Sequence, residues 1–303
     1  MYQAIIKEIP EQVRPLFNQG KVADYIPALG KVSPMKFAMA AKAVSGEIYY
    51  AGEVDEKFSL QSISKAFAMI LAIRMLGDDL WQKVGRSLSA RAFNSISQIE
   101  EYGGRPRNPF TNGGAIAIVD LLLTHDVHYL ESLLILVRKL TGNRKIDYDR
   151  SVAKSEKEFG HRNAAIAYFL KSYGILKNQV EDVLDAYFVQ CSLAMSCNDL
   201  SRSLLFLANR GVDPKNETVV LTPQQNRHLN ALLMMFGTYD GAGDFVFRIG
   251  LPGKSGVGGG IAVIVPGKMV IAVWSPALDE FGTSVAGLKA LEIFIEKGDL
   301  GIF

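Results

Sequence analysis

The order of strand-like and helix-like segments is the sequence feature that most constrains this fold. Apolar runs typical of strands come in two pairs near the ends of the chain, at residues 37–44 and 48–52, then at 261–265 and 269–274. Turn residues join each pair as a hairpin, Ser45-Gly46 in the first and Pro266-Gly267-Lys268 in the second. Both ends of the chain therefore contribute antiparallel strands to one sheet.

Helical periodicity dominates between the two hairpins, from about residue 77 to residue 211. Alternating apolar residues over 244–250 predict a fifth strand, and amphipathic patterns predict helices at 3–18 and 282–296. The predicted fold class is therefore α/β, more narrowly α+β. It consists of an antiparallel five-stranded sheet flanked by helices and an inserted all-helical domain.

The domain boundaries follow from this change of pattern. Residues 1–76 and 212–303 are predicted to form a discontinuous sheet domain, and residues 77–211 the inserted all-α domain, with the active site between them. Helices are also predicted at 126–140, after a capping box at Asn178-Gln179-Val180-Glu181, at 199–209, and after a capping box at Thr222-Pro223-Gln224-Gln225 that leads to Gly237.

Composition and charge exclude several classes of function. The chain of 303 residues has 33 basic and 31 acidic residues, well mixed, and no basic stripe indicates nucleic-acid binding. Its longest apolar run, residues 66–73, is too short to span a bilayer. The first residues do not have the apolar core expected of a signal peptide. Cys191 and Cys197 indicate no disulfide framework. We therefore expect a soluble, cytoplasmic protein without nucleic-acid or membrane partners.

A Ser-x-x-Lys motif stands at the start of that apolar run. Ser62 is predicted at or just inside a helix N-terminus, with Lys65 on the same helix face. Unpaired N–H groups and the positive end of the helix dipole stabilise a developing oxyanion there. The same positive end, with burial, disfavours an ammonium group, so a neutral Lys65 could act as general base. This is the nucleophile motif of the penicillin-recognising serine enzymes.

The motif is weak by itself. Ser33…Lys36 and Ser151…Lys154 share its spacing, and a serine at a helix N-terminus is more commonly a cap. A second signal follows far downstream, where Lys254-Ser255-Gly256 precedes Val257 and three glycines and matches a Lys-Thr-Gly element in type and order. Glycine at this density indicates either a close backbone approach or a turn between strands. The two signals together are far more specific than either alone.

With its remaining motifs, the chain resembles the serine-dependent glutaminases, which have a β-lactamase-like (DD-peptidase-like) fold. The resemblance runs from about Val22 to Gly287, and its motifs occur in the family's order. They are Ala23–Pro27, Leu60-Gln61-Ser62 with Lys65, Ala92–Ile96, Arg107-Asn108-Pro109 through Asn112 to Ala115-Ile116, Ser155-Glu156 with Arg162-Asn163, Leu184-Asp185-x-Tyr187 with Gln190-Cys191-Ser192, Gly237-x-Tyr239-Asp240, and Lys254–Gly260.

The resemblance implies a role for each matched residue. It implies that Ser62 is the nucleophile, Lys65 its general base and Tyr239 a proton-transfer partner. The N–H groups of Ser62 and Val257 are implied as the oxyanion hole. The implied substrate contacts are Tyr25, Gln61, Ser62, Asn112, Glu156, Asn163, Tyr187, Tyr239 and Val257.

The implied reaction is hydrolysis of the side-chain amide of L-glutamine, without a metal or organic cofactor, by a homodimer or homotetramer. The residue types suit this substrate, because a carboxylate such as Glu156 matches the α-ammonium group. Amide and phenol donors, such as those of Asn163 and Tyr187, match the α-carboxylate. Ser62 would attack the carboxamide carbon, ammonia would leave, and water would hydrolyse the γ-glutamyl ester.

Two other functions stay open on the residues alone. A β-lactamase or peptidase is the nearest rival, and Ser196-Cys197-Asn198 supplies a Ser-x-Asn triplet for it, although the expected absence of a signal peptide argues against secreted substrates. A ligand-binding sensor or scaffold of the same fold is the other, although Ser62, Lys65 and Tyr239 argue for turnover. His125, His128 and His161 lack a third ligand at a recognisable spacing, so a zinc site is not predicted.

Three segments depart from the family pattern. Asn-Ala-Gly-Ala-Ile reads Asn112-Gly113-Gly114-Ala115-Ile116 here, which keeps the asparagine and predicts a looser loop. Pro-Ser-Gly reads Ser87-Leu88-Ser89-Ala90, and a late Gly-Asn-Ser reads Gly282-Thr283-Ser284. None of these changes removes a predicted catalytic group.

Overall fold

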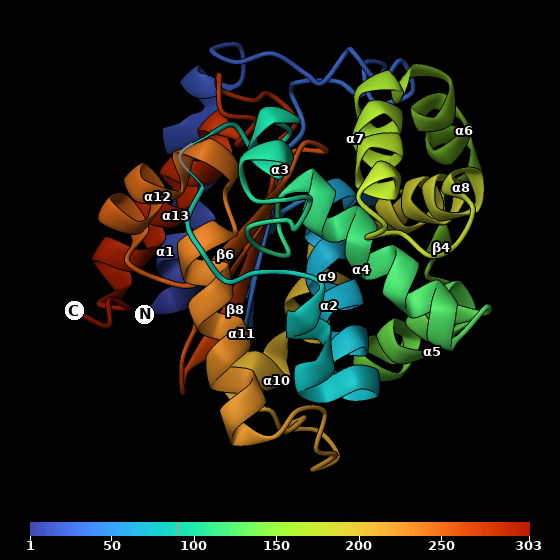
Figure 1. The fold of residues 1–303 in the computed structure, drawn as a ribbon. Helices are drawn as coiled ribbons and strands as arrows, with labels where there is room; N and C mark the ends of the chain where they lie inside the picture. Colours follow the sequence, from blue (N-terminus) through green and yellow to red (C-terminus); the bar gives the residue numbers. More distant parts are fainter. Residues whose placement is uncertain (90) are drawn as a thin grey trace.

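A five-stranded antiparallel sheet organises the structure, a computed structural model that describes residues 1–89 and 91–303 (Figure 1). The strand order is β2-β1-β8-β7-β6. The strands are β1 (Ala38–Ala43), β2 (Ile48–Gly52), β6 (Gly253–Gly256), β7 (Gly260–Val265) and β8 (Met269–Trp274). β1 pairs with β8 from Ala38↔Trp274 to Ala43↔Met269, which joins the N-terminal hairpin to the C-terminal one. The predicted five-stranded antiparallel sheet is confirmed, although one of its strands is not the predicted segment.

Helices make up most of the remaining regular structure. They are α1 (Tyr2–Val13), α2 (Ser64–Leu76), α3 (Ser97–Glu101), α4 (Asn112–His125), α5 (Tyr129–Thr141), α6 (Arg150–Phe159), α7 (His161–Ser172), α8 (Val180–Cys191), α9 (Cys197–Ser203), α10 (Leu205–Ala208), α11 (Pro223–Phe236), α12 (Ala242–Ile249) and α13 (Val285–Gly298). Within the described residues, four 3₁₀ turns, η1 to η4, lie at Arg14–Leu16, Gln61–Ile63, Gly77–Gln82 and Tyr239–Gly241. In the described part of the chain, no helix combines the length and the apolar character needed to cross a membrane.

Helices cover both faces of the sheet. α1, α12 and α13 lie together on one face (Figure 1) and share a core with Met39, Val263 and Ile271. α2, α9 and α10 share a core with Ala40 and Ile264 on the other face. Because both faces are covered, β7 and β8 are buried at every position. This explains why they read as continuous apolar runs and not as strict alternation.

A second, smaller sheet carries the chain into the Ser62 segment. Its order is β3-β5-β4, and the strands are β3 (Phe58–Ser59), β5 (Leu193–Met195) and β4 (Asp147–Tyr148). β3 ends directly before Leu60, whose N–H donates to Leu193 O at 2.8 Å. The segment predicted to be entirely helical, residues 77–211, therefore contains two short strands, which the sequence does not distinguish from loop.

The strand predicted at 244–250 is wrong, because this segment forms α12. Phe245 and Ile249 are its buried residues, one helical turn apart, whereas Phe247 is 90% exposed. Over seven residues, helical and strand periods fit the same apolar pattern about equally well. The fifth strand is instead β6, whose Lys254-Ser255-Gly256 sequence carries no strand propensity.

The predicted helix termini are confirmed in part. The capping box at Thr222 and Gln225 is confirmed, and Gly237 is the C-cap of α11. The box predicted at 178–181 is wrong, because Gln179 caps α8 without a side-chain bond and Asn178 donates to Asp120 instead. The helix predicted at 199–209 is two helices, α9 and α10, divided at Leu204.

Glycines after β6 allow a close contact between two backbones. A Cβ at Gly256 would collide with the Leu60 carbonyl oxygen, and one at Gly258 with the Ser59 carbonyl oxygen. Of the two interpretations of these glycines, a close backbone approach is therefore the one observed at Gly256 and Gly258, where only glycine fits. The contact presses the turn after β6 against the residues that precede Ser62.

Gly258→Ala should destabilise the protein, because the added methyl group overpacks this contact. Overpacking typically costs about 1–3 kcal/mol in the free energy of unfolding. Gly243→Ala in α12 is the matched control, because a Cβ there meets open space. It should stabilise by about 0.5–1 kcal/mol through lower backbone entropy. Urea unfolding midpoints at unchanged slope measure both changes, and equal midpoints for the two variants would contradict the collision.

Candidate active site

Ser62 lies in η2, the short 3₁₀ turn Gln61–Ile63, two residues before α2 begins. Gln61 has φ +50, a left-handed conformation that is uncommon for a residue other than glycine. Its side chain is buried and donates from Nε2 to Ser59 Oγ at 3.0 Å. The predicted position of Ser62 at the entrance to a helix is confirmed, and a strained residue immediately precedes it.

One cavity of about 590 Å³ gathers almost all of the predicted site residues. They come from segments far apart in the sequence, and helices α4, α6, α7 and α8 all contribute. The predicted residues that line the cavity are Tyr25, Gln61, Ser62, Asn112, Glu156, Asn163, Tyr187, Tyr239 and Val257. Lys65 is buried and does not line the cavity. Among the described residues, no three His, Cys, Asp or Glu side chains form a cluster that could hold a metal ion.

Lys65 begins a hydrogen-bonded chain of side chains. Its Nζ donates to Asn112 Oδ1 at 2.7 Å and to Phe110 O at 3.2 Å. Asn112 Nδ2 in turn donates to Asn163 Oδ1 at 2.9 Å. Burial lowers the pKa of Lys65 to about 8, although the charge of Glu156 opposes the shift. A lysine in this environment can exchange a proton near neutral pH.

Glu156 is a buried carboxyl group with an unused oxygen. Its side chain is 7% exposed, and Oε2 has no hydrogen-bond partner among the described residues. Burial raises its pKa to about 8, and the charge of Lys65 partly offsets this shift. A buried carboxyl group at a cavity wall, with an unsatisfied oxygen, suits a cationic ligand.

Tyr239 lies in the 3₁₀ turn Tyr239–Gly241 and, like Gln61, has a positive φ of +55. Its hydroxyl group is buried and makes no hydrogen bond of good geometry with the described residues. Burial raises the pKa of Tyr239, while the nearby Ser62 side chain and the Val257 backbone act in the opposite direction. The phenol therefore lies close to both Ser62 and Val257, in the surroundings expected of a proton-transfer partner.

The buried Lys254 side chain contacts the Tyr239 ring. The Lys-Ser-Gly motif was the only sequence signal for Lys254. Its Nζ lies 4.5 Å from the Tyr239 ring centroid and donates to Gly237 O at 2.5 Å and Ser255 O at 2.7 Å. Burial lowers the pKa of Lys254, and the charge of Lys65 adds to this shift. Two buried lysines therefore flank the serine and tyrosine of the site.

Tyr25 and Tyr187 occupy different depths of the cavity. Tyr187 is 3% exposed, whereas Tyr25 is 62% exposed at the rim. The Tyr25 segment is tethered to α6 by the Ala28 N–H, which donates to Ser155 Oγ at 3.2 Å. Tyr187 therefore belongs to the cavity floor, and Tyr25 belongs to its rim.

A loop that the sequence analysis quoted without a role completes the cavity. Phe93 and Asn94 line it, and the Phe93 N–H donates to Asp240 Oδ1 at 2.9 Å. Arg162 Nε donates to Asn94 O at 3.1 Å. The only sequence signals were the Ala92–Ile96 and Tyr239-Asp240 motifs, because bonds to backbone atoms leave no mark on residue type.

The structure shows the surroundings of two of the three departures from the family pattern. Gly113 lies in the first turn of α4, not in a loop, and Thr111 caps that helix by accepting from the Gly114 N–H. The predicted loosening of a loop is therefore wrong at this position. The Thr283 N–H donates to Asp279, and Ser284 caps α13. Ala90, in the third departing segment, lies outside the described residues.

A half-buried serine beside a buried lysine and a buried tyrosine is typical of hydrolases that attack an amide or ester carbon. The chain belongs to the glutaminase family, whose profile matches residues 20–303. A glutaminase of Vibrio atlanticus (strain LGP32) is 51% identical over 302 residues, which cover 99% of each chain. A glutaminase of Pseudoalteromonas translucida (strain TAC 125) is 47% identical and covers 100% of this chain and 98% of its own.

Solved structures of bacterial glutaminases share the fold over nearly the whole chain. A probable glutaminase from Bacillus subtilis, complexed with 6-diazo-5-oxo-L-norleucine, has a TM-score of 0.90 at 31% identity and covers 99% of this chain and 97% of its own. A covalent complex of a Bacillus subtilis glutaminase with 5-oxo-L-norleucine has a TM-score of 0.87 at 29% identity, with 99% of each chain covered.

Glu156→Gln should stabilise the protein increasingly as the pH rises. Burial raises the pKa of Glu156 from 4.5 to about 8, so the folded state keeps a proton that the unfolded state releases between these values. The stability that the neutral carboxyl contributes is full below pH 4.5 and is lost as the pH rises through 8. Glutamine cannot ionise, so its advantage should grow to roughly 5 kcal/mol above that range.

Urea unfolding across this pH range measures the difference between Glu156→Gln and the parent. Glu158→Gln in the same helix is the matched control, because the Glu158 side chain is 55% exposed and solvent screens its charge. An advantage for Glu156→Gln that does not change with pH would contradict the assignment of a buried, protonated carboxyl group.

Proposed function

We propose that this chain hydrolyses the side-chain amide of L-glutamine to L-glutamate and ammonia through an acyl-enzyme at Ser62. The observation that carries the proposal is one cavity lined by both Ser62 and Glu156, whose carboxyl group is buried. A nucleophile and a cation-binding group in one cavity suit an amino acid whose side chain ends in an amide. Membership of the glutaminase family supports the same substrate.

The covalent complex of the Bacillus subtilis relative supports a nucleophilic mechanism. Its ligand, 5-oxo-L-norleucine, carries a ketone at the position of the glutamine amide carbon, and it forms from a diazo ketone. A diazo ketone forms a covalent bond when a nucleophilic side chain displaces its nitrogen. In this chain, we assign that nucleophile to Ser62.

In the proposed first step, Ser62 Oγ attacks the amide carbon and its proton passes to Lys65. The N–H groups of Ser62 and Val257 bind the oxyanion. The C–N bond then breaks, and the nitrogen leaves as ammonia after taking a proton through Tyr239. In the second step, water attacks the γ-glutamyl ester, and the same groups return the proton to Ser62. The lowered pKa of Lys65, about 8, favours this use as a base.

Substrate recognition is assigned to cavity residues other than the proposed nucleophile, base and proton donor. Glu156 binds the α-ammonium group, whose charge returns the carboxyl to its ionised form. Asn163, Tyr187 and Tyr25 donate to the α-carboxylate, and Gln61 contacts the substrate beside Ser62. Asn112 bonds both Lys65 and Asn163, so it links the base to the substrate contacts.

We also propose a β-lactamase-like fold with the active site between two domains. The sheet domain comprises residues 1–76 and 212–303, and the insertion comprises residues 77–211. The composition of the cavity supports this division, because Ser62 and Tyr239 come from the first part and Glu156 from the second. Assembly as a homodimer or homotetramer remains a prediction.

The β-lactamase alternative loses the Ser-x-Asn triplet that supported it. Ser196 accepts from the Asp199 N–H and caps α9, while Asn198 Nδ2 donates to Asp55 Oδ1 at 2.9 Å. Neither Ser196 nor Asn198 lines the cavity that contains Ser62. The triplet is therefore a helix cap and not a catalytic element.

Ser62→Ala should abolish ammonia release from L-glutamine, with a loss of at least roughly 10⁴-fold in kcat. Ser151→Ala is the matched control, because Ser151 and Lys154 repeat the Ser-x-x-Lys spacing on an exposed part of α6. It should retain the parent's activity. L-Glutamine, L-asparagine and a chromogenic β-lactam are assayed in parallel. Turnover of the β-lactam alone, or turnover of glutamine without Ser62, would overturn the proposal.

Glu156→Gln should raise KM for L-glutamine more than it lowers kcat. A charge-assisted hydrogen bond to the α-ammonium contributes about 1.5–3 kcal/mol, which corresponds to about 10- to 100-fold in KM. The Glu158→Gln variant again serves as the control. An unchanged KM in Glu156→Gln would assign ammonium recognition to another group.

A further inference from the structure

A second cavity adjoins the one that contains Ser62, and Phe93, Tyr239 and Asp240 line both. The second cavity has a volume of about 480 Å³. Its far walls are mostly apolar, and they include Leu88, Phe110, Met234, Phe236 and Val246. The three shared residues therefore form a thin partition between two spaces of similar size.

Phe93 belongs to this partition, and hydrogen bonds anchor its backbone through both the N–H and the carbonyl group. Its N–H donates to Asp240 Oδ1 at 2.9 Å, and its carbonyl accepts from the Asn112 N–H at 2.9 Å. These bonds place the Phe93 ring 4.7 Å from the Tyr239 ring, centroid to centroid, at 45°. Asp240 thus fixes the backbone whose side chain packs against the proposed proton donor.

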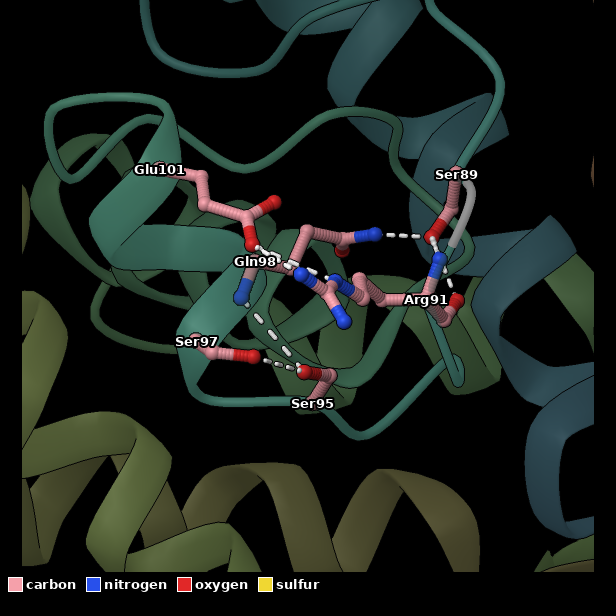
Figure 2. Close-up of polar contacts among 6 residues, drawn as sticks. All are labelled: Ser89, Arg91, Ser95, Ser97, Gln98 and Glu101. Carbon is pink, nitrogen blue, oxygen red and sulfur yellow. Dashed lines mark hydrogen bonds and ion pairs between the residues drawn. The ribbon is translucent and has the colours of Figure 1, made fainter.

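Polar contacts brace the loop that carries Phe93 (Figure 2). Arg91 Nη2 lies 2.7 Å from Glu101 Oε1, and Ser95 Oγ lies 2.9 Å from Ser97 Oγ. Gln98 Nε2 donates to Ser89 Oγ, which joins the start of the loop to α3. These bonds link the two flanks of Phe93 to each other, so the loop has support on either side of the partition.

The location of Tyr239 indicates which end of the substrate meets the partition. On the proposed mechanism, on which this inference rests, Tyr239 delivers a proton to the departing nitrogen. That nitrogen therefore lies beside Tyr239 and faces the Phe93 ring. Any substituent on the nitrogen has to extend toward the second cavity, and Phe93 occupies that path.

We propose that Phe93, positioned by Asp240, restricts the leaving group to ammonia by closing the second cavity off from the site. The chemistry is the same for a substituted amide. Ser62 Oγ bonds to the acyl carbon, the C–N bond breaks, and a primary amine leaves in place of ammonia after taking the proton from Tyr239. Water then releases glutamate. Only the space for the nitrogen substituent differs.

Phe93→Ala should open the partition and admit larger leaving groups. The substrates are L-glutamine and the γ-glutamyl amides of methylamine, ethylamine and benzylamine, and glutamate release reports every reaction. In the parent, kcat/KM should fall steeply as the amine grows. In Phe93→Ala, the ratio of benzylamide to glutamine should rise at least about tenfold, the usual scale for a change in pocket size. An unchanged ratio would overturn the proposal.

Filling the second cavity should reverse this gain. Gly243 lines only that cavity of the two, and a Cβ there meets open space. Gly243→Leu alone should leave glutamine hydrolysis unchanged. Combined with Phe93→Ala, it should return the benzylamide ratio toward the parent's value. A gain that persists in the double variant would show that the substituent does not enter the second cavity.

Asp240 is tested as a positioning residue by comparing alanine with asparagine. Asp240→Ala removes the acceptor for the Phe93 N–H, so the benzylamide ratio should rise severalfold. Asp240→Asn keeps an oxygen there and should restore a ratio close to the parent's. Asp244→Ala is the matched control, since Asp244 pairs only with Arg248 among the described residues and lines neither cavity. Equal ratios for Asp240→Ala and the parent would overturn the role of Asp240.

These outcomes separate this inference from the proposed function. If the parent does not hydrolyse glutamine, or if Ser62→Ala still does, the proposed function fails. If the parent hydrolyses glutamine through Ser62 and the ratios do not respond to Phe93→Ala, only the partition fails. Thermal unfolding of each variant confirms that the compared proteins are folded.

Discussion

The site depends on backbone contacts that only glycine permits. The turn after β6 lies against the Ser59 and Leu60 carbonyls, because neither Gly256 nor Gly258 carries a Cβ. A Cβ at Gly237 would collide with the Gly253 carbonyl, so the same edge of the sheet also receives the segment that leads to Tyr239. These contacts bring Ser62, Val257 and Tyr239 together. The sheet supplies a rigid edge, and the glycines let two other segments reach it.

Burial of ionisable groups gives the site its chemistry and also costs stability. Lys65, Lys254 and Glu156 are each less than 10% exposed. Backbone and amide oxygens accept from both lysines, which offsets part of the cost of removing charge from water. Glu156 Oε2 has no such partner among the described residues. Burial lowers the pKa of Lys65 to about 8 and raises that of Glu156 to about 8, so both groups can change protonation state near neutral pH. Perturbed pKa values of this kind are typical of functional sites.

The sequence predicted the sheet better than the elements around it. The hairpin at Pro266–Lys268 was predictable because turn chemistry and long apolar runs agree there. The helix at residues 244–250 was not predictable, because the apolar pattern of a short helix with two buried residues also fits a strand. β6 was not, because Lys254-Ser255-Gly256 is strand only through pairing with β7. Tertiary contacts decide such short segments, and local propensity does not.

The residues that line the site were predictable, and their environments were not. The motifs shared with the glutaminases pointed to Ser62, Glu156 and Tyr239, and all three line one cavity. The depth of Lys254 and the anchoring of Phe93 depend on contacts between distant segments. A bond from a backbone N–H to Asp240 requires no particular residue at position 93. Sequence reasoning therefore finds the reactive groups more readily than the parts that hold them.

At each position near Ser62, the need for a side chain decides between a strained residue and a glycine. Gln61 and Tyr239 adopt positive φ values, at a cost of about 1–2 kcal/mol each relative to an unstrained residue. Glycine would remove that cost, as it does at Gly259, but it would also remove a side chain that lines the cavity. Where only the backbone has to pass, glycine is used; where the side chain is needed, the strain is retained. The distribution of the two around Ser62 therefore marks which positions contribute backbone and which contribute chemistry.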